Sequence, residues 1–200
     1  MSVKVKAKKS PAQTPVMSFR LKSAWERWLA RNHASSTGLW LKFYRKASGR
    51  PSITYVEALH GALCYGWVDG QKKLKDDLVW LQHFKPRPPR GRWSRLQTEN
   101  AERLIKAARM TPAGLKEVRA AKRDGRWRLA YDPPGSAKIP LDLLQQLSKN
   151  AQAMAFFESL GKADTYAIAY HLQAARDPKI RARRLRSVLS LLAEGQRPSW

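Results

Sequence analysis

Residues 66–84, GWVDGQKKLKDDLVWLQHF, decide the fold class of this chain. Two expected strands, 66–74 and 78–84, flank a short acidic turn at residues 75–77, and this pattern predicts a β-hairpin. Asp69-Gly70 is itself a two-residue hairpin signal, so an alternative hairpin turns there, with a shifted register. We favour the later turn.

A third strand is expected upstream of the hairpin. Gly38 opens the aromatic run LWLKFY at residues 39–44, which is short enough to be a strand. Together with the hairpin, this strand predicts a small antiparallel or mixed sheet of about three strands, packed with helices on one face. The expected fold class is therefore α+β.

Two helices are predicted beside these strands. Ser23 precedes Trp25 and Trp28 at helical spacing, which indicates an N-capped amphipathic helix with both tryptophans toward the core. The Thr-x-x-Glu pattern at residues 54–57 is a capping box, and it predicts a helix that ends near residue 64.

Beyond the hairpin the pattern becomes helical. Ser94 is the expected N-cap of a helix with a buried stripe from Ala101 to Ala108, and Thr111-Pro112 begins another helix. Residues 132–136, DPPGS, give the clearest linker signal in the chain. Every segment after this linker is helical in pattern, so an all-helical C-terminal segment follows the sheet.

The chain is expected to divide into four parts. Residues 1–18 combine Lys, Ser, Pro and Ala with few large apolar side chains, which predicts a flexible basic tail. An α+β domain is expected at residues 19–131, a linker at 132–140 and the helical segment at 141–200.

The chain is strongly basic. Thirty-nine Lys and Arg residues oppose fifteen Asp and Glu residues, which gives a formal net charge of +24 at pH 7. A field of this sign attracts nucleic acids, other polyanions or anionic lipid surfaces with little regard to their sequence. The alternative is an origin in an organism whose proteins are rich in arginine, because net charge is a weak guide to specific function.

The sequence also indicates a compartment. It contains no apolar run of about 20 residues, and no apolar region of a signal peptide follows the N-terminal lysines. The single cysteine, Cys64, excludes an intramolecular disulfide and a CxxC metal site. We therefore expect a soluble cytoplasmic protein without a transmembrane segment, and the sequence gives no indication of its oligomeric state.

A basic, proline-rich loop at residues 85–95 is the best candidate binding surface in the sequence. It offers guanidinium and ammonium groups to phosphates, and Trp93 is the candidate for stacking on bases. The equally weighted alternative is that Trp93 staples the loop onto the following helix. The anion-binding candidates are Lys85, Arg87, Arg90, Arg92 and Arg95.

The last helix offers a second basic face. It begins at Asp177-Pro178 and buries a stripe that runs from Ile180 to Leu192. Lys179, Arg183 and Arg186 project from the opposite side, so they form a secondary candidate surface for anions.

Evidence for catalysis in the sequence is weak. His60 and Cys64 share a helix face at a spacing that suits a metal or a thiolate and its base, but a packed histidine and a buried thiol account for them better. Asp69, beside Trp67 and the lysines after it, is a weak candidate for a catalytic carboxylate. Phosphate-binding loops, nucleophile elbows and zinc-protease motifs are absent, so we expect no cofactor and no metal.

Several ordered motifs are similar to those of the YdeI/OmpD-associated (OmdA, bacteriocin-protection) family. They are YVEAL at 55–59, GWVDG at 66–70, FKPR at 84–87, Trp93-Ser94 and RMTPAG at 109–114, and the basic helical segment 175–192 resembles the C-terminal part of that family. The resemblance covers roughly residues 19–197 of the chain. It implies a stress or protection accessory protein, and it supplies no catalytic residues.

These observations favour a non-enzymatic, OmdA-like accessory protein whose basic surface binds an anionic polymer such as nucleic acid. The alternative is an enzyme that holds a small anionic substrate in a cleft between Trp67 and Asp69. A third interpretation is an adaptor that recruits an acidic protein partner.

Overall fold

The computed structural model describes residues 14–175 and 177–199. Within this part, the chain divides into two compact units. The first takes the residues up to Pro89 and the segment Arg103–Glu117, and the second takes Arg90–Glu102 and the residues from Val118 onward. The predicted four-part division of the chain stays a prediction.

A four-stranded mixed sheet forms the centre of the first unit. Its strands are β1 (Val16–Met17), β2 (Leu39–Tyr44), β3 (Trp67–Leu74) and β4 (Val79–Pro86), in the spatial order β1-β2-β4-β3. β1 runs parallel to β2, and the other neighbours are antiparallel. This confirms the α+β class and the later hairpin turn.

The strand count exceeds the prediction because β1 lies in the expected tail. β1 is only two residues long, which is too short to show a strand pattern in the sequence. Next to it, the carbonyl of Pro15 accepts a hydrogen bond from the backbone amide of Trp40. The last residues of the segment expected to be a tail therefore include a short strand. Residues 1–13 lie outside the described part of the chain.

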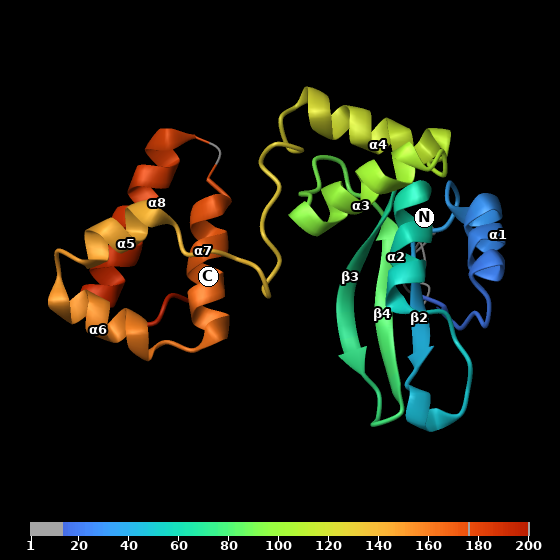
Figure 1. Ribbon diagram of the computed structural model, residues 1–200, viewed down its shortest axis with the longest axis horizontal. Coiled ribbons are helices and arrows are strands. Elements are labelled where there is room, and N and C mark those ends of the chain that lie inside the picture. Colours follow the sequence, from blue (N-terminus) through green and yellow to red (C-terminus); the bar gives the residue numbers. More distant parts are fainter. Residues whose placement is uncertain (1–13, 176, 200) are drawn as a thin grey trace, which may run out of the picture. The chain divides into compact units, whose positions relative to one another are not determined.

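One face of the sheet is covered by two helices, α1 (Lys22–Asn32) and α2 (Tyr55–Cys64), as Figure 1 shows. Trp25 and Leu29 from α1 pack with Ala58 and Ala62 from α2 against the inward side chains of the strands. The inward residues of β2 are Leu39, Leu41 and Phe43, which alternate with less buried neighbours. Burial of these large side chains in one cluster stabilises the first unit.

The two helix starts differ from each other. α2 begins with the predicted capping box, in which Thr54 and Glu57 satisfy each other's backbone amides. α1 begins one residue before Ser23, with Leu21 at its N-cap and no side-chain cap, so the predicted Ser23 cap is wrong. Trp25 is nevertheless fully buried and Trp28 stacks on it at 5.4 Å between ring centroids, which places both tryptophans at the core as predicted.

Two further helices follow the sheet, α3 (Arg95–Lys106) and α4 (Pro112–Arg123). Ser94 caps α3 as predicted, because its hydroxyl accepts a hydrogen bond from the backbone amide of Gln97. The backbone amide of Ser94 in turn donates to the side-chain oxygen of Gln97. The predicted stripe runs too far, since Ala108 lies beyond α3, is exposed and has a φ of 53°.

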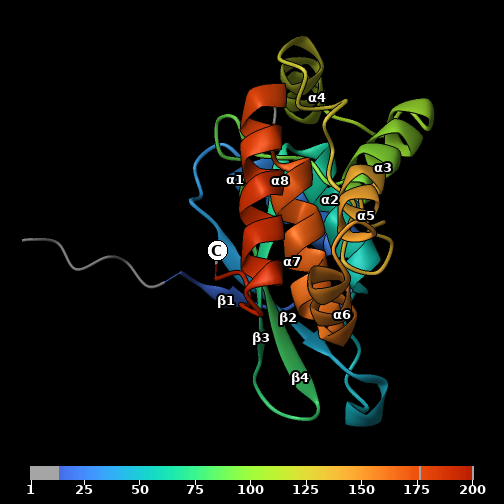
Figure 2. The same cartoon turned by 90° about the vertical axis from the view of Figure 1, so that its left-hand side faces the viewer.

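The C-terminal part is all-helical, as predicted. It consists of α5 (Leu141–Leu147), α6 (Ala151–Ser159), α7 (Lys162–Gln173) and α8 (Pro178–Ala193). α8 packs against the other three around a core that includes Leu143, Ile168 and Val188 (Figure 2). Among the described residues, every helix is too short or too polar to cross a membrane.

Candidate nucleic-acid interface

The outer face of the sheet, opposite α1 and α2, carries aromatic and basic side chains. Because side chains alternate along a strand, Trp40, Lys42 and Tyr44 of β2 project to this face, between the buried residues of the core. The neighbouring β4 contributes Leu81, His83 and Lys85, which alternate with buried Gln82 and Phe84. We call this surface the open sheet face.

Three side chains from three strands meet at its centre. The rings of Trp40 and His83, which are cross-strand neighbours, lie 5.0 Å apart between centroids. The ammonium of Lys73, on β3, lies 4.3 Å from the centroid of the Trp40 ring, within the range of a cation–π interaction. The strand order places β4 between β2 and β3, so Lys73 reaches across β4 to make this contact.

Glycine makes room for this cluster at the end of the strands. Gly38 has a φ of 138°, and a Cβ there would lie 2.9 Å from the carbonyl oxygen of Phe84 and 3.1 Å from Nε2 of His83. The first distance is too short for a real Cβ, the second is tight, and the positive φ is strained for other residues, so glycine allows the backbone to pass this close to the His83 ring.

The open sheet face is positive. Within the described strands, the residues that alternate onto this face include Lys42, Lys73 and Lys85 and no carboxylate. Partial burial lowers the pKa of His83, and the positive charges of Lys85 and Lys73 lower it further. Neighbouring lysines that oppose protonation of a histidine favour an anion at the same place.

The predicted basic loop is divided between the two units. Lys85 is exposed at the end of β4, on the open sheet face, whereas Arg87 is 6 % exposed and its amide donates to the carbonyl of Gly66. Arg90 is exposed in a left-handed backbone conformation, with a φ of 59°. These residues therefore do not form the continuous exposed run that the sequence indicated.

The rest of the loop is clamped onto the segment around Tyr131. Arg92 lies over the rings of Tyr131 and Tyr170, with 5.0 and 4.2 Å from its guanidinium carbon to the ring centroids. Trp93 is 2 % exposed and packs on Trp127 at 4.9 Å between centroids. A ring so deeply buried does not offer its face to a base, so the arrangement of Trp93 matches the alternative in which it fastens the loop.

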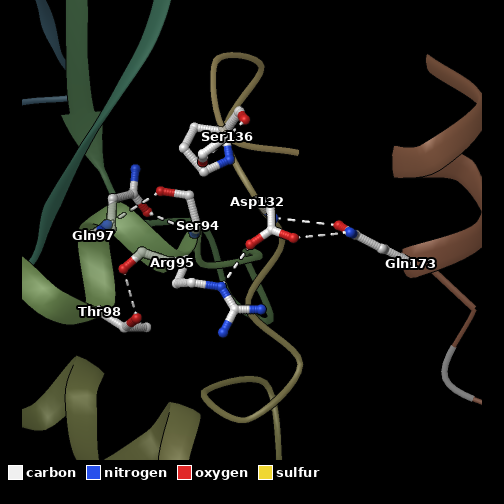
Figure 3. A network of polar contacts seen from close by, with 8 residues as sticks. Ser94, Arg95, Gln97, Thr98, Asp132, Ser136 and Gln173 are labelled. Atoms are coloured by element: carbon white, nitrogen blue, oxygen red, sulfur yellow. Dashed lines mark hydrogen bonds and ion pairs between the residues drawn. The ribbon is translucent and has the colours of Figure 1, made fainter. Parts of the chain in front are cut away.

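A polar network completes this clamp (Figure 3). Arg95 forms an ion pair with Asp132, whose other carboxylate oxygen accepts a hydrogen bond of 3.0 Å from the Gln173 amide. The Asp132 backbone amide donates back to the Gln173 side chain. Arg95 thus joins the start of α3 to α7 within the second unit, and its charge is partly neutralised.

The secondary basic face lies where the sequence placed it. Lys179, Arg183 and Arg186 are exposed on α8, while Val188 and Leu192 are buried on the opposite side. Asp177 caps the helix as predicted, accepting hydrogen bonds from the amides of Lys179 and Ile180. The predicted buried stripe begins later than expected, because Ile180 is exposed.

The carboxylate of Asp69 is engaged within the first unit. It accepts a hydrogen bond of 2.8 Å from the Tyr55 hydroxyl at the start of α2. Trp67 is 1 % exposed, and its indole donates to the carbonyl of His33. Trp67 borders a hollow of about 290 Å³ together with Arg87 and Glu117. Asp69 therefore ties β3 to α2, while Trp67 is directed toward His33.

His60 and Cys64 lie on α2 as predicted. Cys64 is buried, and this burial raises the pKa of its thiol to about 11, so the reactive thiolate is scarce at neutral pH. No group of three or more potential metal ligands occurs among the described residues. The packed-thiol interpretation of Cys64 fits these observations.

Sequence reasoning missed the open sheet face. Its signal was present in LWLKFY, where Trp40, Lys42 and Tyr44 occupy alternate positions between residues destined for the core. Alternation alone did not reveal that Lys73 and His83 join Trp40, because this depends on the strand order β2-β4-β3.

Family comparisons divide the chain in two. A family model described as bacteriocin-protection, YdeI or OmpD-associated (OmdA) matches residues 136–195, which confirms the resemblance for the C-terminal helices and shortens its extent. The motifs at residues 55–114 fall instead within a match to a domain of unknown function, DUF8412, at residues 17–117. Searches of curated proteins and of solved structures gave no match. The chain belongs to the DUF8412 family, and its C-terminal helices match the OmdA model.

Proposed function

We propose that this protein is an accessory protein of the protection type, and that it binds single-stranded nucleic acid on the open sheet face. The observation that carries the proposal is the cluster of Trp40, His83 and Lys73 on a face to which the described strands contribute no carboxylate. Aromatic rings stack on unpaired bases, and nearby lysines contact the phosphates between them. The net charge of +24 adds long-range attraction for the polyanion.

A single strand fits this face better than a duplex does. In a duplex the bases are stacked on each other, so the rings of Trp40 and Tyr44 would have no base face to contact. The lysines would still attract duplex phosphates, but that attraction carries no contribution from stacking. We therefore expect the single strand to bind more tightly than a duplex of the same length.

The test is the triple variant Lys42→Ala, Lys73→Ala and Lys85→Ala. We expect weaker binding of a fluorescent single-stranded oligonucleotide, measured by anisotropy over a series of salt concentrations. Each lost phosphate contact should reduce the slope of log K against log salt by about 0.7. Trp40→Ala should cost a further ~1–3 kcal/mol on the single strand and little on a duplex.

A matched control separates local contacts from total charge. Arg31, Lys106 and Lys116 are exposed on helices of the same unit, and their replacement by alanine removes the same three charges. We expect this control to retain most of the salt slope. Equal losses in the two triple variants, with both proteins folded, would place the binding surface elsewhere and contradict the proposal.

A further inference from the structure

A groove lies at the end of the sheet, beside the start of α2. Its volume is about 660 Å³, within the range of pockets that hold small molecules. The segment between β2 and α2, which contains the short 3₁₀ helix η1 (Lys46–Ser48), forms one side. The residues that carry the argument below are Phe43, Tyr44, Lys46, Arg50, Tyr55 and Trp80.

Aromatic rings form another part of the groove lining, which we call the aromatic wall. Phe43 and Trp80 stack with 4.3 Å between ring centroids and 15° between planes, and Tyr55 lies 6.1 Å from Trp80. Tyr55 is held by its hydrogen bond to Asp69, and Phe43 is anchored in the core. Because Phe43 is only 2 % exposed, the partly exposed rings of Trp80 and Tyr55 present the preformed surface to a planar aromatic group. The ammonium of Lys72 lies 4.7 Å from the centroid of the Trp80 ring and adds a cation to this wall.

Positive groups also line the groove. Lys46 and Arg50 are exposed, and the guanidinium carbon of Arg50 lies 5.7 Å from the centroid of the Tyr44 ring. None of the residues that line this groove is acidic. Asp76 borders a separate hollow with Arg50, and Glu57 is occupied by the backbone and hydroxyl of Thr54.

We infer that the groove binds a nucleoside monophosphate unit, with its base against the aromatic wall and its phosphate at Lys46 and Arg50. A planar base and a dianionic phosphate match these two parts of the groove, and an arginine beside a ring suits both. The groove shares Tyr44 with the edge of the open sheet face but includes none of Trp40, His83 and Lys73, so the inference does not rest on the function proposed for that face.

The first test is calorimetry with adenosine monophosphate (AMP), adenosine and inorganic phosphate. We expect AMP to bind more tightly than either component, because only AMP contacts both the wall and the cations. The double variant Lys46→Ala and Arg50→Ala should lose about tenfold or more of the AMP affinity, since each removed cation takes a charged hydrogen bond with it. Tyr44→Leu should weaken AMP and leave the response to phosphate unchanged.

The control uses cations outside the groove. Arg45 adjoins the same segment and is exposed, and Arg20 is an exposed cation of the same unit; neither lines the groove, so Arg20→Ala with Arg45→Ala removes equal charge. We expect this control to bind AMP as the original protein does. Equal affinity for AMP and phosphate, or equal loss in both double variants, would overturn the inference.

Two further experiments identify the source of the nucleotide and distinguish the groove site from binding on the open sheet face. If the groove receives a strand end, a 5′-phosphorylated oligonucleotide should displace AMP better than its unphosphorylated form; if it receives free nucleotides, the two oligonucleotides should compete equally poorly. The triple lysine variant of the open sheet face should keep full AMP binding. Loss of AMP binding in that variant would show that no separate groove site exists.

Discussion

The ring of His83 packs against Trp40 and feels the positive charges of Lys85 and Lys73, and this environment works against its protonation. Partial burial is the larger cause of its lowered pKa, and Lys85 and Lys73 add to it. A bound phosphate would offset the charge of both lysines and make the protonated ring easier to form. Binding of a polyanion and protonation of His83 should therefore favour each other.

This coupling gives a pH prediction. Affinity for a single-stranded oligonucleotide should rise as the pH falls from about 7.5 to about 5.5, because the bound state takes up a proton more readily at His83. The His83→Gln variant lacks this group, so its affinity should change less over the same range. Anisotropy titrations of both proteins measure the difference, and identical pH profiles would exclude His83 from the binding surface.

The folding stability should depend on pH in the opposite sense to the oligonucleotide affinity, so it should fall as the pH falls. Since the folded protein holds the pKa of His83 below its ordinary value, the unfolded chain binds the proton more readily. His83 therefore contributes stability at neutral pH that is lost as the pH falls below about 6.5. Denaturant unfolding of the original protein and the His83→Gln variant separates this contribution from that of His171, whose pKa is also lowered, chiefly by burial.

Among the elements, α4 lies close to the end of α2 at a glycine. A Cβ at Gly114 would lie 2.4 Å from the carbonyl oxygen of Cys64 and 2.6 Å from that of Leu63, at the end of α2. The hydroxyl of Thr111 donates to the same Cys64 carbonyl at 2.6 Å. Backbone atoms of this kind cannot move aside as the end of a flexible side chain can.

Gly114→Ala should therefore destabilise the first unit by about 1–3 kcal/mol, as overpacking does in other cores. Gly135→Ala is the matched control, because nothing lies within 4 Å of a Cβ at that position. Denaturant unfolding of the two variants gives the comparison. An unchanged midpoint for Gly114→Ala would mean that α4 does not pack on α2 this closely.

The elements that the sequence predicted well are those fixed by neighbouring residues. Three predicted features depend on side chains within a few positions of one another. They are the strand at residues 39–44, the capping box of Thr54 and Glu57, and the cap at Ser94. The sequence did not predict β1, because β1 is a strand only through its pairing with β2, over twenty residues away. Ser23 failed as a cap because α1 begins at Lys22.

The candidate site was harder to predict because it is assembled from distant parts of the chain. The loop at residues 85–95 looked accessible in sequence, but Arg87 and Trp93 are buried and Arg95 is paired with Asp132, thirty-seven residues further on. Basic residues that follow one another need not lie on one surface. Only Lys85 of the predicted cluster belongs to the open sheet face.

At the scale of the molecule, each unit presents its own positive surface. The first unit offers the open sheet face, and the second offers Lys179, Arg183 and Arg186 on α8. Two surfaces on one chain can hold one strand with an affinity that exceeds either alone, provided that the strand is long enough to contact both. Strand length is therefore the variable that reveals whether both surfaces act together.

The last prediction compares a short and a long single strand on the variant Lys179→Ala, Arg183→Ala and Arg186→Ala. A strand short enough to occupy only the open sheet face should bind this variant normally. A long strand should lose affinity, and its slope of log K against log salt should fall by about 0.7 for each lost contact.

The control for total charge is a triple alanine variant in the same unit. It replaces three exposed lysines on other segments, Lys138, Lys149 and Lys162. Because the exposed arginines of α8 make no contribution to its buried core, both variants should unfold at the same denaturant concentration as the original protein. Equal behaviour of the short and the long strand would show that α8 takes no part in binding, and the open sheet face would then act alone.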